Sequence, residues 1–281
     1  MYPKILDLSE IEERTPVSLV GGKALNLGLL FRKGFPVPEG ICLTTELTKS
    51  ILDNKGRLKK GIERKLKAVF AKTFANQIVA VRSSAAEEDS KRASWAGQYC
   101  SSLFVKEPED FVSAVIKCLK SAESFQVAAY QTAIGLKGAR SDMAILVQKM
   151  VEAEVAGVMF TLNPITDCKE EVVIQSTFGA GQPLVAGELT GDIYFLDREG
   201  KVLKEMISPK KFKVTLQGKE KVSEHQQQKS SLSRKELGAL VSLGLQIEQF
   251  FGNHQDIEWA MTKGKIYILQ ARPVTTQKRK E

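Results

Sequence analysis

Two carboxylates, an amide and a guanidinium lie at strand spacing near the end of this 281-residue chain. Asp256 and Glu258 are two residues apart, and so are Gln270 and Arg272. Side chains two apart along a strand project from one face of a sheet. Carboxylate oxygens suit Mg²⁺, and arginine offers forked donors to phosphate. The four residues therefore fit a site for magnesium and a triphosphate, and they fit a solvent-facing ion pair equally well.

The turn between these two strands decides whether the two pairs share a face. A two-residue loop at Lys263-Gly264 would put them on opposite faces of the hairpin. A three-residue loop at Thr262-Lys263-Gly264, with Gly264 in the left-handed conformation, would put them on the same face. We predict the three-residue loop, and with it one polar cluster made of all four side chains.

Two cations elsewhere in the chain are further candidates for binding phosphate. Lys23 follows a Gly-Gly turn and opens a helix, where backbone N–H groups and a cation can meet an anion, although the same pattern marks many ordinary helix entries. Arg82 ends the apolar strand 77–82 and is followed by two serines. Polar groups emerge into clefts at strand ends, and an arginine that caps the sheet is a comparable interpretation.

The elements that would position these residues fall into two regions. Up to residue 140, apolar spacing alternates between helical and strand periods, with helices predicted over 49–76 and 108–134 around the strand 77–82. From residue 141 onward strand patterns dominate. They include a hairpin that turns at Gly200, and a capping box at 233–236 opens the one long helix.

These patterns predict an α+β fold with two domains. Residues 1–140 form a mixed α/β first lobe, residues 141–275 form a mostly antiparallel second lobe, and residues 276–281 form a frayed tail.

The net charge of +8 is concentrated in two segments, 49–72 and 201–221. Each segment contains only one aromatic residue. Proteins that bind single-stranded nucleic acid interleave aromatic residues with cations. We therefore interpret them as solvated faces and expect no nucleic-acid partner. The ordinary share of hydrophobic residues, 43%, excludes disorder as the dominant state.

Targeting and cysteine patterns add further expectations. No apolar run approaches the roughly 18 residues needed to cross a bilayer, and the first ten residues carry carboxylates where a secretory signal would be apolar. We expect a cytoplasmic protein without membrane contact. Cysteines 42, 100, 118 and 168 lack the spacing of a metal site, so we interpret them as scattered core thiols. His225 and His254 have no triad-like context.

Taken in order along the chain, these segments resemble the ATP-binding domain of the phosphoenolpyruvate synthase, pyruvate phosphate dikinase and rifampin phosphotransferase family. The resemblance implies a two-lobed ATP-grasp-type fold. The matching segments are Gly21–Ala24 with Gly34–Pro38, Val81–Ala85 with Glu88–Asp89 and Ala96–Gln98, Val147–Val151 with Ala156–Pro164, and Gln255–Trp259 with Leu269–Pro273. They span nearly the whole chain, and the series is far more specific than any one segment.

The resemblance also implies roles for individual residues. Lys23, Arg82 and Arg272 would contact phosphates, and Arg82 and Arg272 would be the catalytic residues. Asp256 and Glu258 would hold Mg²⁺. The other expected ATP-binding positions are Gln148, Met150 and Val151 beside adenine, Gly97 in the loop over the phosphates, and Gln182 and Gln270 in the ATP–Mg²⁺ site.

The implied activity is transfer of a phosphoryl group from Mg·ATP to a histidine on a separate swivelling domain or subunit. That histidine-bearing phosphocarrier is the expected partner, because the sequence contains no Thr-Ser-His segment of its own. Two positions depart from the family pattern: Gln182 stands where a glutamate is usual, and Cys100 stands where an acid is expected. The alternative function is a non-catalytic ATP-binding regulatory or scaffold module.

Overall fold

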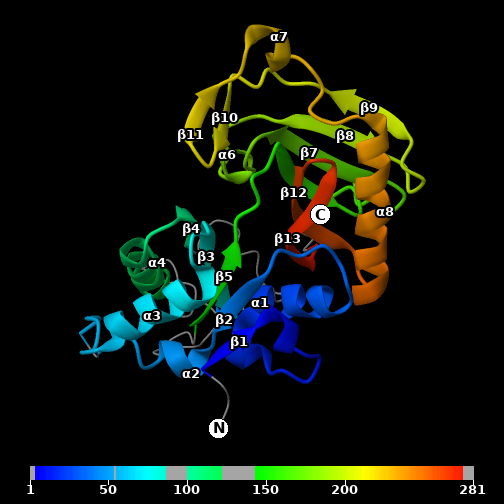
Figure 1. The fold of residues 1–281 in the computed structure, drawn as a ribbon. Coiled ribbons are helices and arrows are strands. Elements are labelled where there is room, and N and C mark those ends of the chain that lie inside the picture. The colour runs from blue at the N-terminus through cyan, green and yellow to red at the C-terminus, as the bar shows by residue number, and fades with distance from the viewer. Residues whose placement is uncertain (1–3, 54, 87–99, 122–142, 275–281) are drawn as a thin grey trace. The chain divides into compact units, whose positions relative to one another are not determined.

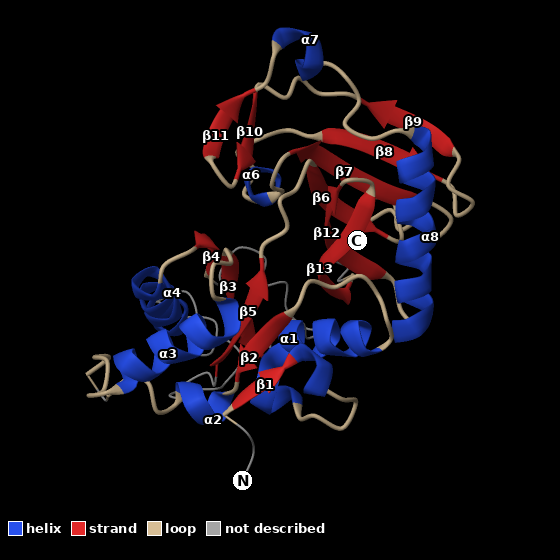
Figure 2. Ribbon diagram, in the orientation of Figure 1, coloured by secondary structure: helices blue, strands red, loops and turns tan. Residues whose placement is uncertain are grey.

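Two antiparallel sheets, one in each half of the chain, organise this protein (Figure 1, Figure 2). The computed structural model describes residues 4–53, 55–86, 100–121 and 143–274. It divides into two compact units, Met1–Met150 and Val151–Glu281. Helices and strands alternate in the first unit, and strands dominate the second. The predicted α+β class, with a mixed first part and a mostly antiparallel second part, is confirmed.

The sheet of the first unit has the strand order β1-β2-β5-β3-β4, and its neighbouring strands pair antiparallel. The strands are β1 (Ile5–Asp7), β2 (Gly40–Leu43), β3 (Val79–Ala85), β4 (Ser101–Val105) and β5 (Met143–Lys149). The helical elements are η1 (Leu8–Glu10), α1 (Val17–Arg32), α2 (Thr45–Thr48), α3 (Ile62–Phe74) and α4 (Pro108–Ser121).

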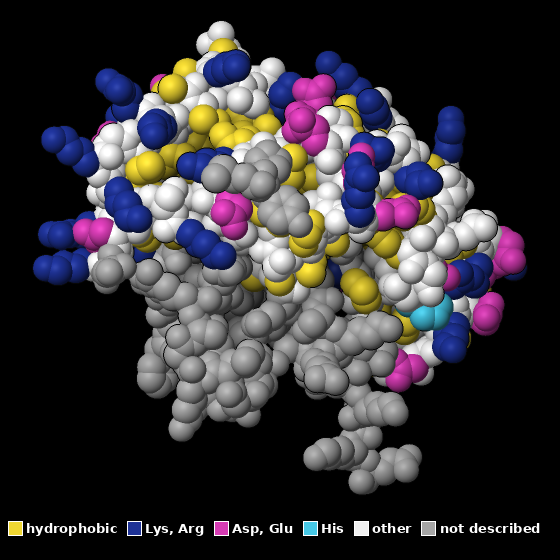
Figure 3. Space-filling model, turned by 90° about the horizontal axis from the view of Figure 1, so that it is seen from below, with side chains coloured by type: hydrophobic (Ala, Val, Ile, Leu, Met, Phe, Trp, Pro, Cys, Tyr) yellow, Lys and Arg dark blue, Asp and Glu magenta, His cyan; other side chains and the backbone are white. Residues whose placement is uncertain are grey.

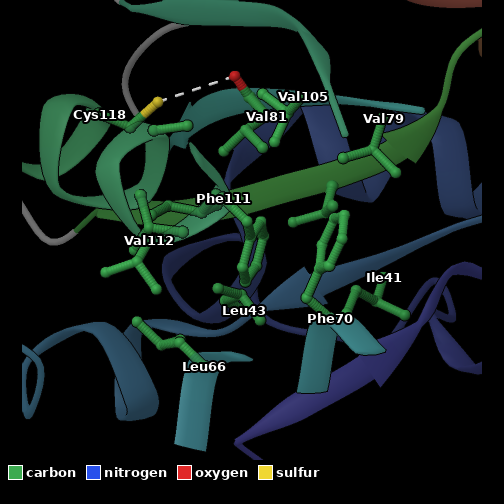
Figure 4. Close-up of a cluster of buried hydrophobic side chains, with 14 of the residues drawn as sticks. Ile41, Leu43, Leu66, Phe70, Val79, Val81, Val105, Phe111, Val112 and Cys118 are labelled. Atoms are coloured by element: carbon green, nitrogen blue, oxygen red, sulfur yellow. Dashed lines mark hydrogen bonds between the residues drawn. The ribbon is translucent and has the colours of Figure 1, made fainter. Parts of the chain in front are cut away.

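The main core of this unit lies between one face of the sheet and the helices α3 and α4 (Figure 4). Alternate residues of β3, Val79 and Val81, point into it. Phe70 of α3 and Phe111 of α4 stack with ring centroids 5.0 Å apart. The opposite face of the sheet contacts α1. Because β3 alternates, Arg82 projects toward the α1 side.

The strand β5 belongs to the first unit, although the predicted lobe boundary at residue 140 placed it in the second. It pairs with β2 on one side and with β3 on the other. Its run from Met143 to Val147 is buried on both faces, as a central strand between two layers of helices requires. The compact units therefore change at Met150.

The main sheet of the second unit has the strand order β13-β12-β6-β7-β8-β9. Its strands are β6 (Val155–Phe160), β7 (Val172–Phe178), β8 (Asp192–Leu196), β9 (Val202–Met206), β12 (Gln255–Thr262) and β13 (Lys265–Pro273). A separate ribbon pairs β10 (Phe212–Thr215) with β11 (Gly218–Lys221), and the helices are α6 (Gln182–Val185), α7 (Glu224–Gln227) and α8 (Arg234–Phe251).

The long helix α8 covers one face of this sheet. The predicted capping box is present, because the Ser233 hydroxyl accepts from the Glu236 N–H and the Glu236 carboxylate accepts from the Ser233 N–H. Gly244 lets α8 approach the sheet closely, since a Cβ at that position would overlap the Met159 side chain of β6. Met159 pairs with Ile257 of β12 and shares its face. Asp256 and Glu258 therefore lie on the face opposite α8.

The two basic segments are mostly exposed, as predicted. Lysine and arginine side chains on the face drawn in Figure 3 are scattered among uncharged and acidic ones. Lys210 is the exception, because it is fully buried with its Nζ 2.5 Å from Oδ1 of Asp192. The other oxygen of Asp192 accepts from the backbone N–H and the hydroxyl of Ser231. A buried charge needs such a partner, so Lys210 does not belong to the solvated face.

In the described part of the chain, no helix combines the length and apolar character that crossing a bilayer requires.

Gly157 of β6 should resist substitution. A Cβ there would overlap the backbone carbonyl of Gln175 on β7, so Gly157→Ala must force the two strands apart. We expect a loss of about 3 kcal/mol in the free energy of unfolding. The matched change is Gly238→Ala in α8, where a Cβ has open space and alanine should stabilise by up to about 1 kcal/mol. Urea unfolding followed by fluorescence measures both, and equal midpoints for the two variants would contradict this reading of β6.

Candidate functional site

The β12–β13 hairpin brings the four polar residues of the last two strands together. Asp256 pairs directly with Arg272, and Glu258 pairs directly with Gln270. Direct partners on antiparallel strands have neighbouring side chains on the same face. The predicted cluster of two carboxylates, an amide and a guanidinium is therefore present on one face of the hairpin.

The turn that closes this hairpin differs from the prediction. Thr262 pairs with Lys265, so the loop has two residues, Lys263 and Gly264, and both have positive φ angles. The predicted three-residue loop is wrong. A two-residue loop alone would have separated the pairs, but the register shifts between Glu258 and Trp259, where β13 carries Leu269 as an extra residue. The bulge offsets the shorter loop, and the four side chains share a face after all.

Asp256 and Arg272 form a partly buried ion pair at the centre of this cluster. The guanidinium Nε and Nη2 lie 2.9 and 2.7 Å from Oδ2 of Asp256. The Asp256 side chain is 13% exposed, and the Arg272 side chain is 25% exposed. Burial raises the pKa of Asp256, Arg272 opposes that shift, and the negative charge of Glu258 adds to it. A further positive charge near these carboxylates would therefore be favourable.

The donor set fits a magnesium ion that is held mainly by its substrate. Mg²⁺ commonly takes one or two carboxylates and completes its shell with phosphate oxygens and water. Asp256 and Glu258 supply two carboxylates two residues apart on a strand. Within the described ranges there is no cluster of three His, Cys, Asp or Glu that could hold a metal by itself. The chemistry suits a metal that arrives with a phosphate compound.

Gln182 begins the short helix α6, on the same side of the sheet as Glu258. The Cβ position of Gly181 lies 3.4 Å from the Cβ of Ala156 on β6. Ala156 pairs with Ala260, which is two residues beyond Glu258 on β12 and shares its face. The Gln182 side chain is exposed. The structure thus places α6 over the strand face that carries the carboxylates.

Lys23 lies in the first unit, just after a break in α1. Gly21 has φ +75°, and a Cβ there would overlap the carbonyl oxygen of Ser84. The Ser84 hydroxyl spans the break, because it donates to the Val20 carbonyl at 2.8 Å and accepts from the Ala24 N–H at 3.1 Å. The predicted glycine turn before this helix is confirmed. Ser84 is the residue that the sequence did not mark, since nothing in a Ser-Ser pair announces a tie to a distant helix.

Lys23 and Arg82 both lie beside the second half of β3. Arg82 is the middle residue of this strand, so the prediction that it ends the strand is wrong. The ammonium of Lys23 donates to the carbonyl of Ser83 at 3.3 Å, and its side chain is buried. Arg82 pairs with Leu146 on one side and with Ser101 on the other, and it is half-buried. The first unit therefore carries one cation on β3 and a second on α1, beside the same strand.

The predicted segment 148–151 begins in the first unit. Gln148 is buried, and its amide donates to the Pro38 carbonyl at 3.3 Å. The N–H of Met150 donates to the Ile78 carbonyl at 2.9 Å. Val151 is the first residue of the second unit. Gly97 lies outside the residues that the structure describes.

The expected site residues therefore form two sets. The first unit holds Lys23, Arg82, Gln148 and Met150, and the second unit holds Val151, Gln182, Asp256, Glu258, Gln270 and Arg272.

Sequence comparison assigns most of the chain to a known type of domain. The profile of the pyruvate phosphate dikinase AMP/ATP-binding domain matches residues 55–281. The chain belongs to this family. It is 32% identical to rifampicin phosphotransferase of Bacillus cereus over 97% of this chain and 36% of that protein. It is also 32% identical to a probable phosphoenolpyruvate synthase of Archaeoglobus fulgidus, over 97% of this chain and 42% of that protein.

The family domain thus spans about two-fifths of the length of these curated relatives. Among solved structures, a D-alanine–D-alanine ligase from Bacillus anthracis is similar over 91% of this chain and 57% of that one, at 8% identity and a TM-score of 0.39. The family resemblance predicted from the motifs is confirmed.

The Asp256–Arg272 pair gives a prediction for stability and pH. Arg272→Gln removes the partner of a mostly buried carboxylate, so the pKa of Asp256 should rise further. We expect a loss of about 1 to 3 kcal/mol in the free energy of unfolding at pH 7. A raised carboxyl pKa in the folded state means that stability falls as pH rises through it, so the deficit should shrink at pH 4, where Asp256 takes up a proton.

NMR titration of the Asp256 carboxyl and thermal unfolding at both pH values would measure these effects. The control is Arg234→Gln, because Arg234 is 62% exposed and pairs with Glu205 at the surface. That variant should change stability by less than about 1 kcal/mol at either pH. A deficit for Arg272→Gln that is equal at pH 4 and pH 7 would rule out an unpaired Asp256 as its cause.

Proposed function

We propose that this chain binds Mg·ATP and transfers a phosphoryl group to a histidine on a separate swivelling domain or subunit. The reaction would be the ATP half-reaction of a dikinase of the phosphoenolpyruvate synthase or rifampicin phosphotransferase type. The observation that carries the proposal is the β12–β13 cluster, in which two carboxylates and an arginine share one sheet face. Membership in a family of AMP/ATP-binding domains supports it.

Each residue of the cluster has a distinct task in this proposal. The carboxylates of Asp256 and Glu258 hold Mg²⁺, which neutralises charge on the phosphate oxygens when bound. Arg272 donates to a phosphate oxygen and holds Asp256 ionised in its partly buried place. Gln270, directly opposite Glu258, adds an amide to the same face. Gln182 approaches this face from α6.

The first unit would supply the remaining contacts. Lys23 holds a carbonyl at 3.3 Å, a weak contact that its ammonium can exchange for a phosphate oxygen. Arg82, in the middle of β3, would act with Arg272 on the charge that develops as the phosphoryl group moves. Gln148, Met150 and Val151 would lie beside adenine. Gly97, outside the described residues, would lie over the phosphates.

This set of residues matches what phosphoryl transfer needs. The histidine nitrogen attacks a phosphorus atom of ATP in line with the P–O bond that breaks. The protein therefore has little covalent chemistry to perform. Its contribution is to place the phosphates and to offset their charge through fixed cations. The histidine comes from the partner.

Gln182 favours a second candidate, a regulatory or scaffold module that binds ATP without turnover. An amide is neutral, so it cannot hold a cation as the glutamate usual in the family can. The two candidates share the ATP site and differ only in turnover.

The ATP site can be tested by titration calorimetry of the full chain with Mg²⁺ present. Lys23→Ala and Arg272→Ala should each weaken ATP binding by about 10- to 100-fold, because each removes a charge-assisted contact to phosphate. Arg234→Ala removes an exposed arginine from the second unit and should leave affinity unchanged. Circular dichroism confirms that each variant is folded. Unchanged affinity in both Lys23→Ala and Arg272→Ala would overturn the site assignment.

Turnover can be tested with Gln182→Glu and a supplied histidine domain from a relative. The half-reaction predicts ATP-dependent phosphorylation by the native chain, and the variant should be faster because a third carboxylate approaches the metal. The binding module predicts no phosphorylation by the native chain. Gln217→Glu makes the same chemical change at an exposed turn between β10 and β11 and should have no effect on the rate.

A further inference from the structure

Two cysteines meet at the edge of the core in the first unit. Cys100 directly precedes β4 and is half-buried, and Cys118 lies on α4 and is fully buried. The Sγ of Cys118 is 3.5 Å from the backbone oxygen of Cys100. It is 3.8 Å from the backbone oxygen of Val81, the contact drawn in Figure 4. The side chain of Cys118 also lies near enough to that of Cys100 to lower the pKa of the Cys100 thiol. The helix α4 therefore holds one thiol against the other.

The surroundings make the two thiols unequal. The hydrogen bond from Cys118, assisted by Lys117 and Ser102 against the effect of burial, lowers the pKa of Cys100 to about 6. The same hydrogen bond and burial raise the pKa of Cys118 above its usual range, and Lys23 and Lys117 only partly oppose this. The half-buried Cys100 is thus the more acidic thiol of the pair, and the buried Cys118 is the less acidic one.

This arrangement is the one that reactive cysteine pairs need. A thiolate with solvent access attacks an oxidant, and a second thiol within reach completes the disulfide. The other buried cysteine, Cys42, donates its thiol to the Val20 carbonyl of α1, and burial raises its pKa. Cys168 lies in the second unit and is not part of this core.

We propose that Cys100 and Cys118 form a peroxide-reactive thiol pair, with Cys100 as the nucleophile and Cys118 as the resolving thiol. The Cys100 thiolate attacks one oxygen of hydrogen peroxide, and the O–O bond breaks. Hydroxide departs, and Cys100 becomes a sulfenic acid. The sulfur of Cys118 then attacks the sulfenic sulfur and gives up its proton, the S–O bond breaks, and water leaves. One thiolate and one thiol become one disulfide, and the peroxide is reduced to water and hydroxide.

The disulfide would join the start of β4 to α4. Both elements pack on β3, the strand that carries Arg82, and Lys23 is close enough to influence Cys118. The thiol chemistry itself does not depend on the proposed ATP site.

The test is oxidation of the full chain with hydrogen peroxide, followed by tryptic digestion and mass spectrometry. We expect a linked pair of peptides containing Cys100 and Cys118, which dithiothreitol separates. Cys118→Ser should stop the reaction at a sulfenic acid on Cys100 that dimedone traps, and Cys100→Ser should abolish the linked pair. Cys168→Ser is the matched control and should leave it unchanged. Oxidation of Cys168 in preference to Cys100, or no linked pair, would overturn the proposal.

A second measurement leaves both cysteines in place. The rate at which iodoacetamide alkylates Cys100 in the native chain should reach half of its plateau near pH 6, as expected if the thiolate is the reacting form. Lys117→Gln should shift this midpoint upward, and Lys120→Gln, on the same helix, should shift it less. A midpoint at pH 8 or above for the native chain would contradict the proposed nucleophile.

Discussion

Charge that is taken out of water needs a partner close by, and this constraint governs the parts of the protein that carry its chemistry. Asp192 meets it through Lys210 and Ser231, which gather three separate segments of the second unit around one carboxylate. Asp256 meets it through Arg272. The two solutions differ in exposure, because the first pair is sealed and the second remains partly open to solvent. Only the open pair can exchange partners with a ligand, so the same electrostatic rule yields a structural tie in one place and a candidate binding site in the other.

The shared face of the four polar residues was predictable from strand spacing, and the route to it was not. Spacing by two fixes which side chains of one strand lie together, and this depends on the backbone alone. The relation between two strands depends on loop length and on bulges, which follow from hydrogen bonding and twist across the whole sheet. Leu269 carries no mark that distinguishes a bulged residue from a paired one. The predicted three-residue loop was therefore wrong. The prediction that the four side chains share a face was right, because the bulge at Leu269 offset the shorter loop.

Other outcomes divide along the same line between local and distant causes. The capping box at Ser233 and the glycine turn before Lys23 are local patterns, and both were found from the sequence. The place of β5 depends on which strands it pairs with, and its apolar run fits either unit. Burial of Lys210, in the loop between β9 and β10, depends on Asp192, which is 18 residues away on β8. The family could be found because its motifs occur in the same order along the chain. Such a series can be recognised without first working out which residues, far apart in the sequence, come into contact.

The break in α1 at Gly21 has a mechanical consequence. A left-handed glycine usually suggests freedom of movement, but here the Ser84 hydroxyl bonds to both sides of the break and the backbone of β3 fills the space beside it. The hydrogen bonds of Ser84 thus fix the break in place. They hold the helical stretch that begins after Gly21 against the end of β3. The backbone segments that carry Lys23 and Arg82 would therefore move together. No flexible joint lies between them to absorb the motion, so a displacement of one segment would also displace the other.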